Sequence, residues 1–381
     1  MKSVYSIIVA FSLMLCASCF WKADSNALSD DTLRHMAAKM LMVGFKGDTI
    51  TDDNPVVGYL SNLKVGGVIL FDIDLTGSRE LGSRNITTAP RLSKLTAQIR
   101  ELAPDGIIIA ADQEGGRVQR LKPQYGFLQL PAAQYLGAID NPDTTAYYAD
   151  IMAKELVEAG INLNLAPDLD LHSDSCPVIG LLERAYSSEP EKVTLHAGIT
   201  IDHLHQVGIL TAVKHFPGHG SANADSHYGL TDVTATWSPR ELEPFKQLIA
   251  NGKVDMVMTA HIFNRQLDSV MPATLSPHIL TDILRESFGF KGIILTDDMY
   301  MQGIIDNYSI EEAVIAAINA GADMLIMGNN ISTGFEPERP YVITDMIVKA
   351  VKDGKIPQER IVESYNRIVR TLNSLKEGVN N

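Results

Sequence analysis

Eight short apolar runs, rich in valine, isoleucine and leucine, recur along this chain with longer helix-forming stretches between them. Runs of this length and composition predict buried strands, and the stretches between them predict helices. A chain that alternates strand and helix in this way builds a parallel sheet, and eight such units close into a (β/α)8 TIM-type barrel. The runs cover residues 39–45, 65–71, 106–111, 161–166, 208–213, 254–260, 292–296 and 322–327.

Helix boundary signals between the runs support this alternation. Ser238 with Pro239 predicts a helix start, because serine caps the first turn and proline fits its opening position. Ser309, followed by glutamates in the first turn, predicts a second start, and Gly321 closes an alanine-rich helix directly before the last run. A final charged helix is expected over residues 357–375.

An open doubly wound sheet is the alternative arrangement of strands and helices. It would carry a Gly-x-Gly-x-x-Gly turn after an early strand to hold a dinucleotide, and no such turn is present. The chain of 381 residues also lacks a Gly-, Ser- or Pro-rich linker long enough to separate two domains. We therefore expect a single barrel domain over residues 28–377.

The first residues have the pattern of an export segment. Lys2 supplies a positive charge, residues 7–16 form an apolar run too short to span a bilayer comfortably, and small residues precede Cys19. This pattern predicts a signal over residues 1–19. It resembles a bacterial lipoprotein cleavage site with Cys19 as the lipidated residue, although Cys16 stands where such sites usually carry leucine. We expect an exported protein, either periplasmic or anchored to the membrane as a lipoprotein.

The formal net charge of −14 argues against several classes of partner. Nucleic acids and anionic membrane surfaces are bound by basic patches, which this composition does not provide. From Cys19 onward the only further cysteine is Cys176, so no disulfide within the chain is expected there. Cys176 precedes a proline and has no histidine beside it, so we expect a loop or core residue rather than a nucleophile.

Polar residues follow the predicted strands at the end where barrels carry their chemistry. In this fold the loops after the strands form one face, and ligand-binding residues collect there. Cationic and carboxylate groups that converge on one face suit a neutral, hydroxyl-rich ligand such as a sugar. The strand-end residues are Asp112, Glu114, Asp168, Asp170, Lys214, His215, His261, Asp297, Asp298, Asn329 and Asn330.

The segment after the fifth run concentrates ionisable side chains in a Gly- and Pro-rich turn. Residues 214–220 read KHFPGHG, and Asp225 and His227 follow in the same loop. A carboxylate two residues from a histidine can orient the imidazole and stabilise its charged form, as a general acid or base requires. A solvated turn and a metal site are the alternatives.

A metal-dependent barrel hydrolase is a further alternative, and it would place a His-x-His pair at the end of its first strand. The first run ends in VGFK at residues 43–46, so that pair of ligands is missing. We therefore expect no metal and no cofactor.

Three separated segments resemble the signature blocks of glycoside hydrolase family 3, and in particular its β-N-acetylglucosaminidases. They are residues 112–120 (DQEGGRVQR), residues 214–220 together with 224–227, and residues 296–299 (TDDM). The resemblance extends over roughly residues 36–375. It implies a (β/α)8 barrel and a retaining double-displacement mechanism in which a histidine–aspartate dyad on a loop is the acid and base.

The resemblance also implies a role for each matching residue. Asp297 would be the nucleophile, His227 the proton donor and then the base, and Asp225 the partner of His227. Ala185 stands where the family more often has serine, so the resemblance does not fix how Arg184, the residue before it, is oriented toward the sugar. Substrate contacts would come from Asp112, Arg120, Arg184, Lys214 and His215.

The chemistry of these residue types agrees with the implied roles. A carboxylate at a rigid strand end can stabilise the positive charge that develops at the anomeric carbon and then form the covalent intermediate. An imidazole has an unperturbed pKa in the range needed to protonate the leaving oxygen. Strand alternation points Asp298 away from Asp297, so we expect Asp298 to be a solvated or supporting carboxylate.

The implied activity is removal of terminal β-linked N-acetylglucosamine from peptidoglycan-derived or chitin-like oligosaccharides. A family 3 β-glucosidase and a glycoside phosphorylase are alternatives, the latter because a neutral histidine repels an incoming phosphate less than a carboxylate would. A non-catalytic sugar-binding lipoprotein is the alternative from another class. The oligosaccharide is the one partner that the sequence implies, and no protein partner is expected.

Overall fold

The computed structural model of the chain describes residues 28–225, 229–331 and 334–379. The predicted export segment, Cys19 and His227 lie outside these residues. Among the helices that are described, none is both long enough and apolar enough to cross a membrane.

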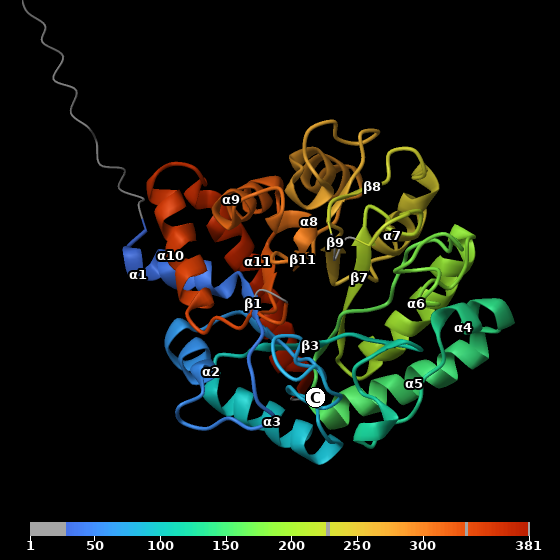
Figure 1. The fold of residues 1–381 in the computed structure, drawn as a ribbon, viewed down its shortest axis with the longest axis horizontal. Coiled ribbons are helices and arrows are strands. Elements are labelled where there is room, and N and C mark those ends of the chain that lie inside the picture. Colours follow the sequence, from blue (N-terminus) through green and yellow to red (C-terminus); the bar gives the residue numbers. More distant parts are fainter. Residues whose placement is uncertain (1–27, 226–228, 332–333, 380–381) are drawn as a thin grey trace, which may run out of the picture.

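Eight strands close into a barrel in the order β1-β12-β11-β9-β7-β6-β3-β2, and neighbouring strands are parallel. Each predicted apolar run overlaps one of these strands, and the closed barrel confirms the (β/α)8 fold (Figure 1). The strands are β1 (Leu41–Val43), β2 (Gly67–Ile69), β3 (Ile108–Ala111), β6 (Leu163–Asn164), β7 (Leu210–Phe216), β9 (Met256–Thr259), β11 (Ile293–Asp298) and β12 (Met324–Met327).

Two strands continue beyond their predicted ends. β7 runs through Lys214 to Phe216, and β11 runs to Asp298. The register of each strand against a neighbour shifts within the added part, and such irregularities re-aim side chains at barrel rims. Lys214, His215, Asp297 and Asp298, which were expected to follow the strands, are therefore part of them. The hydrogen bonds of the sheet hold the backbone at these residues.

Helices surround the strands on the outside of the barrel (Figure 1). They are α1 (Asp30–Lys39), α2 (Pro55–Gly58), α3 (Ala89–Leu102), α4 (Ala133–Ile139), α5 (Pro142–Ala159), α6 (Pro190–Gln206), α7 (Glu243–Ala250), α8 (Gln302–Ile305), α9 (Ile310–Ala320), α10 (Arg339–Lys352) and α11 (Gln358–Val379). Shorter or wider helical segments are η1 (Tyr59–Leu63), η2 (Pro123–Tyr125), η3 (Pro239–Leu242), η4 (Ala273–Leu275) and η5 (His278–Ser287). Two small strand pairs join β4 (Gln113–Gly115) to β5 (Val118–Gln119) and β8 (Thr231–Asp232) to β10 (Ile262–Phe263).

The helix boundary signals hold at α9 and fail at α7. Ser309 forms a capping box with Glu312 at the start of α9, and Gly321 ends the same helix. Ser238 makes no side-chain capping bond, and it precedes the 3-10 segment η3 instead of an α-helix. The α-helix begins one turn later, where Pro244 occupies its first turn.

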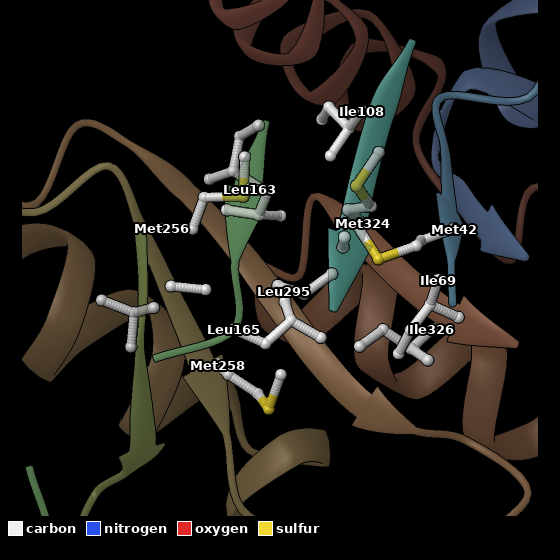
Figure 2. Packing of buried hydrophobic residues seen from close by; sticks show 14 of the residues in the cluster. Met42, Ile69, Ile108, Leu163, Leu165, Met256, Met258, Leu295, Met324 and Ile326 are labelled. Atoms are coloured by element: carbon white, nitrogen blue, oxygen red, sulfur yellow. The ribbon is translucent and has the colours of Figure 1, made fainter. Parts of the chain in front are cut away.

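Apolar side chains fill the N-terminal half of the barrel. Met42, Met256 and Met324 come from three different strands, and all three are fully buried. Figure 2 shows these side chains within the packed interior. Methionine is flexible enough to fill irregular gaps between the strands. Because this half is packed, a ligand has to approach from the C-terminal ends of the strands, which we call the mouth of the barrel.

At the opposite end of the barrel, Asp323 ties the last helix to the strands. Its Oδ1 accepts hydrogen bonds from Arg360 at 2.7 Å and Arg367 at 2.9 Å, and its Oδ2 accepts one from Arg285 at 2.7 Å. Burial would raise the pKa of the Asp323 carboxyl, but the three guanidinium groups outweigh burial and lower it. The buried carboxylate therefore stays ionised and holds three cations.

We expect Asp323→Ala to lower the free energy of unfolding by about 2–4 kcal/mol, because it leaves three partly buried arginines without their shared anion. Urea unfolding followed by circular dichroism measures this loss. Asp353→Ala is the matched control, since Asp353 pairs with Lys349 on the surface, and its urea midpoint should equal that of the wild type. Equal midpoints for the Asp323 and Asp353 variants would contradict the anchoring role.

Candidate active site

The mouth of the barrel is built around Lys214. The lysine projects from β7, its side chain is 3% exposed, and its Nζ lies between two carboxylates. Nζ donates to Asp112 Oδ1 at 2.9 Å and lies 2.7 Å from Glu114 Oε1. Asp112 directly follows β3, and Glu114 lies in β4, so Lys214 joins two neighbouring parts of the mouth.

Glu114 also holds Arg184 through a two-pronged ion pair. Arg184 Nε donates to Glu114 Oε2 and Arg184 Nη2 donates to Glu114 Oε1, both at 2.8 Å. This planar geometry fixes the guanidinium in direction as well as in position. Glu114 was predicted as a strand-end residue but not as one of the substrate contacts. Its spacing of two from Asp112 was the available signal, because residues two apart on an extended chain point to the same face.

Arg120 extends the same network to the other side of Asp112. Arg120 Nη2 donates to Asp112 Oδ2 at 3.1 Å, and Nη1 lies 3.7 Å from Asp72 Oδ1. Asp72 is fully buried and also binds Lys122, while the Tyr125 hydroxyl donates to Asp72 Oδ2 at 3.2 Å. Asp72 was missed, although it directly follows the second predicted strand run.

Charges alternate along this network, and each charge stabilises its neighbours. Burial would raise the pKa of the Asp112 carboxyl, but Lys214 and Arg120 outweigh it and hold that pKa well below its usual range. Burial acts on Glu114 in the same way, and Arg184 and Lys214 lower its pKa to about 2. Burial would lower the pKa of Lys214, but Asp112 and Glu114 raise it. All of these groups are therefore charged at neutral pH.

His215 forms the inner end of the network together with Asp170. Burial, and next the Arg184 charge, lower the pKa of the His215 imidazole to about 4, so the ring is neutral. His215 Nδ1 lies 2.7 Å from Asp170 Oδ2, and Nε2 lies 3.2 Å from Arg184 Nη2. A neutral ring that donates from Nδ1 to the carboxylate leaves Nε2 to accept from Arg184. Asp170 sets the orientation of the imidazole, although it was predicted only as a strand-end residue.

Asp297 and Asp298 end β11 on the other side of the mouth. The backbone N–H of Asp298 donates to Asp297 Oδ1 at 2.8 Å. The Asp298 carboxylate accepts backbone hydrogen bonds from Tyr300 at 3.0 Å and Gly328 at 3.2 Å. Burial, opposed by the Tyr300 amide and reinforced by Asp297, raises the pKa of Asp298 to about 6. Asp298 therefore binds backbone amides. Of the two expected roles, a solvated or a supporting carboxylate, it has the supporting one.

His261 closes this side of the mouth. Its Nε2 lies 3.0 Å from the Asp298 carbonyl oxygen, and its Nδ1 lies 2.8 Å from the Thr274 hydroxyl. The ring is fully buried. Because an imidazole nitrogen facing a carbonyl must donate, His261 holds the end of β11 in place.

The structure therefore connects all five predicted substrate-contact residues in one network of hydrogen bonds and ion pairs. Asp297 lies at the end of β11 at the same mouth, and its charge opposes the effect of burial, which lowers the pKa of His215. Asp225 lies within the described residues, but His227 does not, so the geometry of the predicted dyad remains a prediction. The connected residues are Asp112, Arg120, Arg184, Lys214 and His215.

Asp168, Asp170 and His215 have ligand atoms within 4.8 Å of one another, close enough to hold a metal ion. The Arg184 guanidinium already faces this group, with Nε 3.5 Å from Asp168 Oδ2. A bound metal ion would place a second positive charge beside the arginine. The three residues are therefore better suited to hold Arg184 than a metal ion.

Comparison with known proteins identifies the class of this barrel. Residues 32–371 match the glycosyl hydrolase family 3 N terminal domain. The chain therefore belongs to glycosyl hydrolase family 3, and it is a glycoside hydrolase, as the resemblance of the three sequence blocks implied.

Relatives within the family are named for activity on hexosaminides. The "Beta-hexosaminidase" of Tolumonas auensis is 41% identical over 271 residues, which cover 70% of this chain and 76% of the relative. The "Beta-hexosaminidase" of Nitrosomonas eutropha is 36% identical over 299 residues, covering 76% and 80%. A solved family 3 β-N-acetylglucosaminidase from Paenibacillus sp. superposes with a TM-score of 0.81 at 31% identity. That comparison covers 92% of this chain but 63% of the Paenibacillus chain.

We expect Glu114→Gln to lower kcat/KM on a β-N-acetylglucosaminide by roughly 10- to 100-fold, as loss of a charged hydrogen-bond partner costs about 1.5–3 kcal/mol. The amide would leave Lys214 and Arg184 as neighbouring cations without the anion between them. Steady-state kinetics measure the change. Glu183→Gln is the matched control, because the Glu183 side chain is 48% exposed and 4.0 Å from Arg117. Similar kinetics for both variants would show that Glu114 does not organise the site.

Proposed function

We propose that this protein is a retaining β-N-acetylglucosaminidase. It hydrolyses terminal β-linked N-acetylglucosamine from peptidoglycan-derived or chitin-like oligosaccharides. The observation that carries the proposal is the connected polar network at the mouth of the barrel, where β11 also ends at Asp297 and Asp298, in a barrel whose opposite half is packed with apolar side chains. The names of the relatives support the sugar that is removed.

The network would bind the hydroxyl-rich sugar through groups that are already fixed in place. Arg120, Arg184 and Lys214 offer N–H donors, and Asp112 offers carboxylate oxygens to sugar hydroxyls. His215 is neutral, and a sugar hydroxyl could donate to its Nε2 in place of the 3.2 Å contact from Arg184. Because the partners of these groups hold their positions before the substrate arrives, little ordering is needed on binding.

The reaction would proceed in two displacement steps at the anomeric carbon. Asp297 attacks that carbon while His227 donates a proton to the leaving oxygen, which gives a glycosyl-Asp297 ester and a free alcohol. In the second step His227 removes a proton from water, and the water oxygen displaces the Asp297 carboxylate. Asp225 would orient the imidazole and stabilise its charged form. No metal or cofactor takes part in this mechanism.

We also propose that the protein is exported and held at the membrane through a lipid on Cys19. The apolar run and the small residues before Cys19 support this placement. Membrane fractionation of cells that express the wild type and Cys19→Ala tests it. The variant should leave the membrane fraction, and retention of both proteins there would contradict lipidation of Cys19.

Asp297→Ala should abolish release of the chromophore from an aryl β-N-acetylglucosaminide, because the carboxylate both stabilises the transition state and forms the intermediate. Asp298→Ala should retain measurable turnover, since its carboxylate supports the backbone. The opposite outcome, with Asp297→Ala active and Asp298→Ala inactive, would assign the nucleophile to Asp298. Running the wild-type assay with and without phosphate separates hydrolysis from phosphorolysis, since only the latter yields a sugar phosphate.

His227→Ala should separate the two chemical steps. Substrates with poor leaving groups need a proton and should lose most of their kcat, whereas aryl glycosides that release a stable phenolate should keep a fast first step. Asp225→Ala should give a milder form of the same pattern, because it does not transfer the proton itself. Equal losses for good and poor leaving groups, or loss of wild-type activity with a chelator, would contradict the dyad.

A further inference from the structure

The segment that leads from β7 to the predicted dyad is packed on a defined floor. We call residues 217–225 the dyad loop, because Asp225 ends it. Trp237 Nε1 donates to the Pro217 carbonyl at 3.0 Å, and Asp170 Oδ1 accepts from the His219 amide at 2.7 Å. The floor therefore contains the segment just before α7 and the segment after β6.

Glu241 is the buried carboxyl of this floor. It lies in η3 and is 3% exposed. Its side chain packs directly under Gly218: a Cβ on that glycine would lie 2.5 Å from Glu241 Cβ and 2.7 Å from Oε2. Oε2 has no hydrogen-bond partner of normal geometry among the described residues, although the Ser221 hydroxyl and the Gly220 amide lie near enough to favour the charged form.

We propose that Glu241 is a positioning residue for the dyad loop: its carboxyl holds the loop in place while it is protonated and weakens this packing once it is ionised. The proposal rests on the proposed function, because the loop matters to catalysis only if the dyad supplies the proton. Glu241 acts through the loop and touches neither the substrate nor the reacting atoms.

The surroundings of Glu241 disfavour its charge. Burial raises the pKa of the carboxyl to about 7, the Ser221 hydroxyl opposes this shift, and the nearby Asp170 charge adds to it. Asp170 faces Glu241 from the segment after β6, and the loop itself carries His219 and Asp225. Burial and the neighbouring His215 lower the pKa of His219 to about 3, so its ring stays neutral throughout the relevant range.

The sign of the effect follows from the raised pKa. A carboxyl whose pKa is higher in the folded protein stabilises the packed loop fully below its ordinary pKa of 4.5. That stabilisation is lost as the pH rises through about 7. Above this range an ionised carboxylate lies under the Gly218 backbone with the Asp170 charge nearby, and we expect the loop to move away from it toward solvent.

The fluorescence of Trp237 can report on the packing of the dyad loop, and this measurement does not require catalytic activity. Trp237 is 4% exposed, bonded to Pro217, and one of two tryptophans in the chain. In a Trp21→Phe background its fluorescence should titrate with a midpoint near pH 7, which matches the raised pKa of Glu241. Glu241→Gln in the same background should keep the low-pH signal across the whole range. An unchanged titration in Glu241→Gln overturns the proposal.

Glu155→Gln is the matched control for this titration. Glu155 is also a buried glutamate whose pKa is raised by burial, but it lies in α5 and accepts a hydrogen bond from the Leu128 amide. Its replacement should leave the Trp237 titration intact. If Glu155→Gln abolished the titration as well, the signal would report general loosening and the proposal would fail. Matching urea midpoints at pH 5.5 establish that the variants are folded.

Kinetics on a substrate with a poor leaving group give the second readout. At pH 8 about a tenth of wild-type molecules would keep Glu241 protonated, one pH unit above its midpoint. The ratio of the Glu241→Gln kcat to the wild-type kcat should therefore be up to roughly tenfold higher at pH 8 than at pH 5.5. The ratio cancels the titration of the dyad, which both proteins share. A ratio that stays constant with pH overturns the proposal.

The two readouts distinguish failure of this proposal from failure of the proposed function. A Trp237 titration that depends on Glu241 in a protein without β-N-acetylglucosaminidase activity would leave the loop contact in place and remove its catalytic role. An active enzyme whose Trp237 signal does not titrate would leave the function in place and remove the role of Glu241.

Discussion

The ion pair between Glu114 and Arg184, shared with Lys214, is the interaction on which the mouth of the barrel depends. Taking charges out of water is unfavourable, and a buried pair is stable only if each charge has well-placed partners. Glu114 satisfies this condition with bonds of 2.7–2.8 Å to two cations. Each of these cations in turn reaches a second acidic group, Asp168 or Asp112. The residues proposed to bind substrate are thus fixed as a set, and removing one member leaves a buried charge without its partner.

The rest of the fold confines this set to one end of the molecule. Methionines from β1, β9 and β12 fill the interior, so polar side chains from the strands gather only where that packing ends. At the other end, Asp323 binds arginines from η5 and α11 and holds the last helix against the strands. The apolar packing and the Asp323 cluster thus lie away from the mouth, where the polar groups are arranged for binding.

Periodicity and strand-end position predicted the barrel and the residues that reach its mouth. Eight apolar runs each held a strand, because buried parallel strands need continuous apolar sequence. The pairings were harder to foresee. Asp72, Glu114 and Asp170 are partners of predicted site residues, but each lies in a different part of the chain from the cation or imidazole that it binds. Their proximity depends on the closure of the barrel and on the β4–β5 hairpin, and neither can be read from local pattern.

The two halves of the proposed machinery are supported in different ways. Asp297 belongs to a strand that pairs on both sides, and the backbone amide of Asp298 holds its carboxylate. Asp225 follows β7 through a turn that contains Gly218 and Gly220 and packs on the floor described above. The turn needs glycine at Gly218 because Glu241 lies directly beneath it, so the turn depends on a single buried carboxyl for support at that point. A nucleophile must be fixed at the anomeric carbon, whereas an acid and base must serve two steps with different partners. A loop packed on the Glu241 carboxyl suits an acid and base, whereas a strand end suits the nucleophile.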